Sequence, residues 1–383
     1  MRTRLTLISC LLISAPGLWP QPKPRARDLG VPFRGETGAN NAVTDIAGVE
    51  VGHTTLISDN GKAVRTGVTA VWPRGKASRD PAFGGWFSLN GNGEMTGTAW
   101  IDESGFVDGP VLITNTHSVG VVRDAFIRWQ VERGVPPGTN FSPGGFFSLP
   151  IVAETYDGFL NDTNGFHVEP RHVFQALDGA SGGRVAEGNV GGGTGMVCYG
   201  FKGGIGTASR KAGEYTVGAL VQCNCGRRDQ LTVAGVPVGR EITAGIPNAR
   251  GAEWIREDTG SIIIVVATDA PLMPHQLKRL ARRVSMGLAR TGSTSGNGSG
   301  DLFLAFSTAN PGAARASGAV SLRMLPNDEL NPLFTATVES VEEAIVNSMV
   351  AAETMTGFQG HRVIALPHGQ LREALKKYGR LGQ

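Results

Sequence analysis

The residues with the clearest chemical potential are Gly260 and Ser261, which stand directly before the run Ile262-Ile263-Ile264-Val265-Val266. This apolar, β-branched run predicts a buried strand, and serine is a poor first residue for a core strand unless its hydroxyl has a task. The glycine has no Cβ, so the peptide before Ser261 can adopt backbone angles that are closed to other residues. A strained carbonyl beside a serine hydroxyl is the arrangement that an N→O acyl shift needs.

In such a shift the hydroxyl attacks the preceding carbonyl, the resulting ester is hydrolysed, and Ser261 becomes a new N-terminus. One residue then carries a hydroxyl nucleophile and an α-amine, whose ordinary pKa of roughly 7.7–8.0 suits base chemistry near neutrality. The alternative is a turn residue that enters a strand and does no chemistry.

Two polar residues precede another apolar run, Leu302-Phe303-Leu304-Ala305-Phe306. Ser299 and Asp301 are two positions apart, so in an extended backbone their side chains point to the same side. A hydroxyl and a carboxylate placed in this way could relay a proton to a nucleophile. The alternative is a Gly/Ser loop that ends in a turn aspartate.

Three further polar residues follow apolar segments. Glu154 and Tyr156 close the apolar run 149–153 and share one face, and Asn224 follows the strand predicted over 217–222. A carboxylate can hold a substrate ammonium, while a phenol and a side-chain amide can donate hydrogen bonds to an oxyanion.

Other chemistries find less support in the sequence. The cluster 188–195 is rich in glycine but lacks the Gly-Lys-Ser/Thr of a phosphate loop, so it is interpreted as turns that line a cavity. His167 and His172 are not part of a His-Glu-x-x-His zinc motif. A Ser-His-Asp triad with His117 is disfavoured because the Gly-Ser pairs at 260 and 292 lack the neighbours of a Gly-x-Ser-x-Gly elbow.

Six segments, in order along the chain, resemble the family of L-aminopeptidase/D-esterases and β-aminopeptidases, which are self-processing serine peptidases. The resemblance spans roughly residues 33 to 365. The matching segments are 41–49 (NAVTDIAGV), 114–120 (TNTHSVG), 153–158 (AETYDG), 220–224 (LVQCN), 260–261 (GS) and 297–301 (NGSGD).

This resemblance implies cleavage between Gly260 and Ser261, with Ser261 as the nucleophile, supported by Ser299 and Asp301. Asp301 stands where some relatives have the longer glutamate. The resemblance places Tyr156 and Asn224 at the oxyanion and Glu154 at the free amine of the substrate. It also implies an α+β fold, a layered α-β-β-α sandwich similar to N-terminal-nucleophile hydrolases with different connectivity, assembled as a homo-oligomer of αβ units. No metal or cofactor is expected.

The sequence thus predicts an autoprocessed serine aminopeptidase or amidase that releases N-terminal residues, L-α, D-α or β, from short peptides, amides or esters. Either the freed Ser261 amine or the Ser299/Asp301 pair would act as the base. One alternative is a self-processing acyltransferase of the ornithine acetyltransferase type, which would normally carry threonine at the new N-terminus. The other is a non-catalytic binding protein of the same fold.

The secondary structure that must position these residues is partly visible in the sequence. Strands are predicted over 67–72, 111–114, 216–222, 261–267 and 302–307. A helix is predicted to begin at Pro274, and a short closing helix carries Leu371 to Tyr378. A further apolar stripe from Val338 to Ala352 predicts a helix with a capping box at Ser340-x-x-Glu343 and Gly357 as its terminator. Because strands often follow one another directly, layered sheets are expected instead of a doubly wound βαβ series.

Composition and the N-terminus bear on partners and location. Arg2 and Arg4 precede an apolar stretch that predicts a signal peptide over 1–20, followed by a linker over 21–32 and a single domain over 33–383. Cleavage would divide it into an α chain 21–260 and a β chain 261–383. A periplasmic or secreted protein is favoured over a cytoplasmic one. The net charge of only +3, without a basic run, argues against a nucleic-acid partner, and no later segment is apolar enough to span a membrane.

The cysteines are expected to be chemically quiet. Cys10 would leave with the leader, and the odd number that remains, with a Cys-x-Cys spacing at Cys223 and Cys225, suits neither a disulfide framework nor a four-ligand zinc site. Cys198, Cys223 and Cys225 are therefore predicted to be buried thiols that pack as small apolar side chains.

Overall fold

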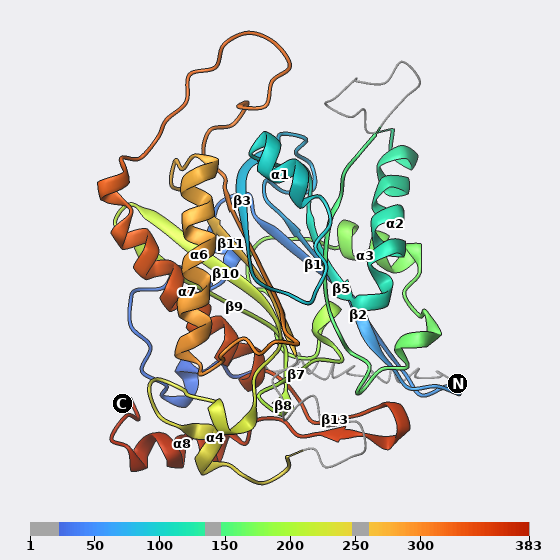
Figure 1. Ribbon diagram of the computed structural model, residues 1–383, viewed down its shortest axis with the longest axis vertical. Coiled ribbons are helices and arrows are strands. Elements are labelled where there is room, and N and C mark those ends of the chain that lie inside the picture. The colour runs from blue at the N-terminus through green and yellow to red at the C-terminus, as the bar shows by residue number, and fades with distance from the viewer. Residues whose placement is uncertain (1–22, 135–146, 247–259, 383) are drawn as a thin grey trace, which may run out of the picture.

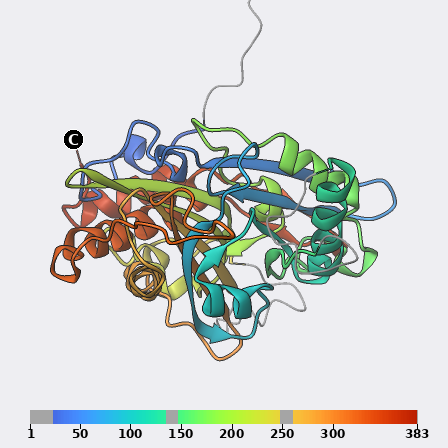
Figure 2. The ribbon, with the colours of Figure 1, turned by 90° about the horizontal axis from the view of Figure 1, so that it is seen from above.

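Two β-sheets face each other between two layers of helices in the computed structural model, which describes residues 23–134, 147–246 and 260–382 (Figure 1). The view from above shows the same order of layers, with helices on both outer sides and the sheets between them (Figure 2). The α-β-β-α sandwich expected from the resemblance is confirmed.

The first sheet has the strand order β1-β2-β5-β6 in the described part of the chain. Its strands are β1 (Glu50–Ser58), β2 (Val64–Trp72), β5 (Val111–Asn115) and β6 (Ile151–Thr155). The neighbours β5 and β6 are parallel. The helices α2 (Val119–Glu132) and α3 (Pro170–Asp178) cover the outer face of this sheet.

The second sheet has the order β4-β3-β12-β11-β10-β9 among the described residues. Its strands are β3 (Ala82–Gly91), β4 (Phe106–Val107), β9 (Gly204–Ala212), β10 (Tyr215–Asn224), β11 (Ser261–Thr268) and β12 (Gly300–Ser307). Only the central pair β11 and β12 is parallel within it. The helices α6 (Pro274–Arg290) and α7 (Asn331–Val350) cover its outer face.

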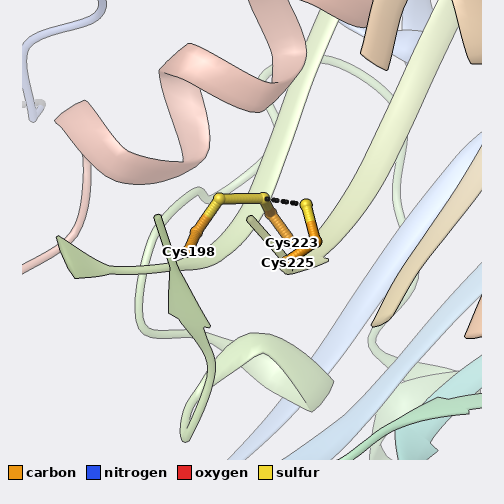
Figure 3. Close-up of side chains that lie close together, drawn as sticks. All are labelled: Cys198, Cys223 and Cys225. Atoms are coloured by element: carbon orange, nitrogen blue, oxygen red, sulfur yellow. Dashed lines mark hydrogen bonds between the residues drawn. A yellow bond between two sulfur atoms is a disulfide. The ribbon is translucent and has the colours of Figure 1, made fainter. Parts of the chain in front are cut away.

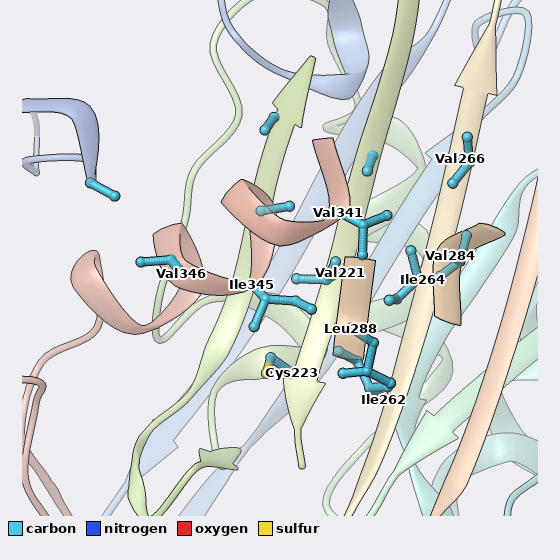
Figure 4. Close-up of a cluster of buried hydrophobic side chains, with 14 of the residues drawn as sticks. Val221, Cys223, Ile262, Ile264, Val266, Val284, Leu288, Val341, Ile345 and Val346 are labelled. Carbon is cyan, nitrogen blue, oxygen red and sulfur yellow. The ribbon is translucent and has the colours of Figure 1, made fainter. Parts of the chain in front are cut away.

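The position of β11 explains its unbroken apolar sequence. Alternate residues of a strand point to opposite faces of the sheet. Ile262 and Ile264 belong to the core between the sheet and helices α6 and α7, whereas Ile263 and Val265 belong to the core between the two sheets. Figure 4 shows Ile262, Ile264 and Val266 beside side chains of both helices. Because both faces are buried, no polar alternation appears in the sequence.

Smaller elements complete the described part of the chain. They are α1 (Thr98–Ser104), α4 (Val238–Glu241), α8 (His368–Lys377) and the two-residue strands β7 (Val197–Cys198), β8 (Phe201–Lys202), β13 (Met355–Thr356) and β14 (Arg362–Val363). Short 3-10 turns connect several of them. None of the helices in residues 23–134, 147–246 and 260–382 has the length and apolar character that a bilayer crossing requires.

The five predicted strands are confirmed within a few residues. The helix predicted to begin at Pro274 and the short closing helix near the C-terminus are confirmed as well. The start and end predicted for α7 are wrong. Ser340 and Glu343 lie inside this helix, where Ser340 Oγ donates to Val217 O (3.3 Å) and Glu343 pairs with Arg210 (2.5 Å). Both side chains are buried and contact other elements. Their Ser-x-x-Glu spacing therefore reflects these tertiary contacts and does not mark the start of a helix. The helix ends at Val350, well before Gly357.

Two predicted segments have a different character in the structure. Residues 23–32, predicted as a linker, pack on α7, where Ala26 is buried and its N–H donates to Asn347 Oδ1 (3.0 Å). The glycine cluster 188–195 is closely packed at Gly192. A Cβ on Gly192 would lie 2.1 Å from Gln222 Oε1 and 2.8 Å from Ile113 O, so this segment is wedged between the two sheets. The predicted leader, 1–20, lies outside the described residues.

Candidate active site

Gly260 and Ser261 lie in the middle of the second sheet at the end where β11 begins, beside the end of β10. Ser261 is paired with Asn224, the last residue of β10. A Cβ on residue 260 would lie 2.1 Å from Asn224 O, so only glycine fits in front of the serine. The glycine that the sequence singled out is thus needed for close approach of two backbones.

Ser299 and Asp301 meet the Gly260–Ser261 bond from the neighbouring strand, β12. The Ser299 hydroxyl is within hydrogen-bond reach of the Gly260 carbonyl oxygen and of Asp301 Oδ1 (2.6 Å). The backbone N–H of Gly300 donates to Ser261 Oγ (3.1 Å). All three side chains are buried. The structure therefore brings together the hydroxyl, the carboxylate and the predicted nucleophile.

Glu154 enters the same region from the first sheet, near the end of β6. Its carboxylate accepts hydrogen bonds from the backbone N–H of Glu94 (3.0 Å) and from Thr116 Oγ1. Burial raises the pKa of Glu154 above the usual value for glutamate, and these two hydrogen bonds oppose that rise. A buried carboxylate with this environment can be stabilised by an incoming ammonium group.

Tyr156 and Asn224 are connected across the two sheets. Asn224 Nδ2 donates to the backbone oxygen of Tyr156 (2.9 Å), and Asn224 Oδ1 accepts from the N–H of Val197 (2.8 Å). The Tyr156 side chain is 44% exposed. Burial, with the adjacent Asp157 carboxylate as a second cause, raises the pKa of Tyr156, so the phenol keeps its proton and remains a donor at neutral pH.

A cavity of about 540 Å³ joins these residues. Four of the predicted site residues line it, together with residues that the sequence did not indicate. The lining consists of Asn92, Gly93, Glu94, Thr116, Glu154, Tyr156, Asn224, Ser261 and Gly298. No lysine or arginine is among them, whereas two carboxylates are, so the cavity suits a cationic group and not an anionic one. Ser299 and Asp301 lie behind it, in contact with the Gly260–Ser261 bond.

Several contributors to the site were missed. Thr116 lies in the matching segment 114–120, where a polar residue after a buried strand could have drawn attention to it. Glu94 and Gly300 each contribute a backbone N–H, and Glu94 also lines the cavity. His117, considered for a triad, is exposed beside this region and stacks on Phe166 with ring centroids 6.2 Å apart.

The prediction of three buried thiols is wrong for two of the cysteines, because Cys198 and Cys223 form a disulfide (Figure 3). Cys225 is buried with its Sγ 3.9 Å from Cys223 Sγ. The three sulfur atoms form the one His/Cys/Asp/Glu group in the described ranges that is close enough to hold a metal ion. Two of them are joined to each other, which leaves no three-thiolate ligand set. The pairing was not predictable, since the short strand β7 reaches the end of β10 only through the tertiary fold.

Comparisons with known proteins agree with this geometry. Residues 41–363 match the model of peptidase family S58. The chain is 55% identical to a β-peptidyl aminopeptidase, BapA, of Sphingosinicella microcystinivorans over 94% of this chain and 93% of the relative. A second β-peptidyl aminopeptidase, from Sphingosinicella xenopeptidilytica, is 48% identical over 97% of this chain and 96% of its own length.

A solved structure is also similar, that of the L-aminopeptidase D-Ala-esterase/amidase of Ochrobactrum anthropi. That protein is described as a prototype of the serine aminopeptidases and as a new variant of the N-terminal-nucleophile hydrolase fold. It superimposes with a TM-score of 0.86 at 49% identity and covers 94% of this chain and 100% of its own. None of these relatives is named as an acyltransferase. The chain therefore belongs to peptidase family S58 and is a serine aminopeptidase with this variant of the N-terminal-nucleophile fold.

Proposed function

We propose that the chain cuts itself between Gly260 and Ser261 and then uses Ser261 to release N-terminal residues from short peptides, amides and esters. The observation that carries this proposal is the contact between the Ser299 hydroxyl and the Gly260 carbonyl oxygen, beside the Ser261 hydroxyl. A donor on that oxygen stabilises the charge that develops there when the carbonyl is attacked.

Self-cleavage proceeds in two steps. Ser261 Oγ forms a bond to the Gly260 carbonyl carbon, the C–N bond breaks, and the nitrogen of Ser261 takes up a proton to become an amine. Water then hydrolyses the ester, which leaves a carboxylate on Gly260 and restores the Ser261 hydroxyl. The products are an α chain that ends at Gly260 and a β chain of residues 261–383.

In the reaction on substrate, Glu154 receives the free amine and Ser261 Oγ attacks the carbonyl carbon. Two groups are placed to accept the proton of the hydroxyl: the new α-amine of Ser261 and the Ser299/Asp301 pair. Asn224 and Tyr156 donate to the oxyanion of the tetrahedral intermediate, and losing one such donor typically costs about 10²–10³ in rate.

We also propose that β-amino residues are accepted at the N-terminus of the substrate. Two relatives with high sequence identity are β-peptidyl aminopeptidases, and both align with nearly the whole of this chain. A β-amino acid places its ammonium one carbon farther from the carbonyl than an α-amino acid does. The anchoring carboxylate and the nucleophile line the same cavity of about 540 Å³.

Intact mass measurement of the purified protein tests the self-cleavage. The wild type should give two chains, one of which begins at Ser261, whereas Ser261→Ala should give one uncut, inactive chain. Ser293→Ala is the matched control, because Gly292 and Ser293 form a second Gly-Ser bond that does not begin a strand, and this variant should be cut normally. A wild-type protein that is active as a single chain would end the proposal.

Export to the periplasm or beyond is proposed as well, since residues 2–18 have the pattern of a leader and a disulfide is typical of proteins outside the reducing cytosol. In a fractionated bacterial host the mature protein should lie outside the cytoplasm, with an N-terminus beyond residue 15. A cytoplasmic protein that retains Met1 contradicts this.

A further inference from the structure

A tight hairpin lies beside Asn224. It consists of β7, β8 and the two-residue turn Tyr199-Gly200, in which both residues have positive φ angles, +51° and +68°. Such an angle is uncommon for a bulky residue such as tyrosine and persists only where neighbouring contacts impose it. Here the Tyr199 N–H donates to Cys225 O (2.7 Å), and its phenol oxygen lies 2.7 Å from Thr291 Oγ1.

The hairpin determines which way the Asn224 amide faces. The backbone N–H of Val197 needs an acceptor, and within the Asn224 amide only Oδ1 can accept. The backbone oxygen of Tyr156 needs a donor, and only Nδ2 can donate. A flipped amide would place oxygen against oxygen and N–H against N–H, so the two contacts select one orientation. Nδ2 carries two hydrogens, and the contact with Tyr156 uses one of them.

The disulfide connects the residues next to these hydrogen-bond partners. Figure 3 shows the bond between Cys198 and Cys223. Cys198 follows Val197 and Cys223 precedes Asn224, so the disulfide spans the same gap as the hydrogen bond from Val197 N to Asn224 Oδ1. On the other side of Asn224, Cys225 is held to the hairpin by the hydrogen bond from Tyr199. The amide is thus bracketed by one covalent and one hydrogen-bonded link to the same hairpin.

A buried lysine fixes the peptide group that Asn224 contacts. Lys202 Nζ donates to Met196 O (2.8 Å) and Gly203 O (2.8 Å) and lies 3.3 Å from Gly193 O. Met196 O and the Val197 N–H belong to one peptide unit. Hydrogen bonds in a chain polarise one another, so the lysine donor on this carbonyl strengthens the N–H that supports Asn224.

We propose that the hairpin 197–202 is a positioning element for catalysis, and that the Cys198–Cys223 disulfide keeps the Asn224 amide in the place and orientation that the oxyanion requires. This rests on the proposed role of Asn224 as an oxyanion donor. Preorganised donors are effective because they need no rearrangement during the reaction, so loosening this one lowers the rate of the chemical step and leaves substrate binding by Glu154 intact.

The test compares Cys198→Ala/Cys223→Ala with Cys225→Ala, using the self-processed enzyme and a β-alanyl anilide as substrate. Cys225→Ala truncates a buried cysteine that flanks Asn224 equally but is outside the disulfide. The double variant should lose about tenfold in kcat, with KM unchanged within about twofold, because displacement costs less than the about 10²–10³ of complete donor loss. Cys225→Ala should keep both constants within about twofold.

The same pair of substitutions in an Asn224→Ala background separates positioning from general support of the fold. If the disulfide acts through Asn224, its removal has no further effect on kcat there. An equal loss in both backgrounds overturns the inference while the proposed function stands. A normal kcat for Asn224→Ala itself would instead show that the oxyanion assignment is wrong.

Reduction of the folded wild type covers the case in which the double variant does not fold. With dithiothreitol, kcat should fall in step with the appearance of two additional thiols and recover on reoxidation, whereas Asn224→Ala should not respond. Full activity after both thiols have been titrated contradicts the inference.

Discussion

Ser299 has one hydroxyl hydrogen and two acceptors within reach, the Gly260 carbonyl oxygen and Asp301 Oδ1. The carboxylate of Asp301 contacts Ser299 directly. Asn224 Nδ2, by contrast, donates to Tyr156 O in the uncut chain. The donor beside the bond proposed to be cut therefore differs from the donor proposed for the substrate.

We accordingly expect Ser299→Ala and Asn224→Ala to separate the two reactions. Ser299→Ala should slow self-cleavage by about 10²–10³, because the Gly260 oxyanion loses its donor. Asn224→Ala should be processed within about tenfold of the wild-type rate and then hydrolyse substrate about 10²–10³ more slowly. The measurement is a time course of intact mass after expression, followed by kinetics of the processed enzyme. Equal delays of processing in the two variants would refute this division.

A second residue-scale prediction concerns Glu154. Glu154→Gln should reduce kcat/KM on free-amine substrates by about 10² or more, since removing one partner of a buried ion pair leaves the other charge desolvated. Self-cleavage has no ammonium to bind, so it should proceed normally. N-acetylated substrates should be poor for the wild type; equal hydrolysis of acetylated and free substrates would rule out this role.

The pH profile gives an independent check on Glu154. Burial raises its pKa, so acidification neutralises the carboxylate at a higher pH than it would an ordinary glutamate. The kcat/KM of the wild type should therefore fall as pH decreases through this raised pKa, and Glu154→Gln should lack that acidic limb. An identical acidic limb in both proteins would assign it to another group.

At the scale of elements, the sequence predicted those whose burial pattern is unambiguous. β11 is apolar on both faces, and α6 alternates Leu277, Leu280 and Val284 with basic residues, so either pattern has one simple interpretation. α7 shows the opposite case. It is buried around most of its surface, so the polar residues Ser340 and Glu343 serve tertiary contacts and imitate a helix start.

The candidate site was predictable only in part. Ser261, Ser299 and Asp301 lie at strand entrances that the sequence reveals, and the roles of Glu154, Tyr156 and Asn224 came from the resemblance to a family. Glu94 and Gly300 contribute backbone N–H groups, which all residue types except proline have. The Cys198–Cys223 pairing depends on the packing of a two-residue strand, which is too short to leave a pattern.

At the scale of the whole molecule, a segment of the described residues suits a contact with another chain. The segment between β12 and α7 rises above the body in Figure 1 and exposes Val320, Leu322 and Met324 by 37%, 38% and 53%. Exposed apolar groups close together on one segment suggest a contact with another molecule. We propose that this segment contributes to a homo-oligomer of αβ units.

The triple variant Val320→Ser/Leu322→Ser/Met324→Ser should therefore have a smaller molar mass than the wild type in light scattering coupled to size exclusion. The catalytic constants of this smaller species are measured in the same experiment. Val131→Ser, which alters a 59% exposed residue on α2, is the control and should leave the mass unchanged. A triple variant of wild-type mass would exclude this segment from the interface.

The intact peptide bond between Gly260 and Ser261 determines when the enzyme can begin to act on substrate. In the uncut chain the nitrogen of Ser261 is part of an amide and has no basic lone pair, and the Gly260 carbonyl engages Ser299. Under the proposed self-cleavage each new chain is thus a zymogen that carries its own first substrate, and it turns over once on itself before it meets a peptide. Maturation then needs no second protease and is independent of protein concentration, so the onset of activity is timed by folding.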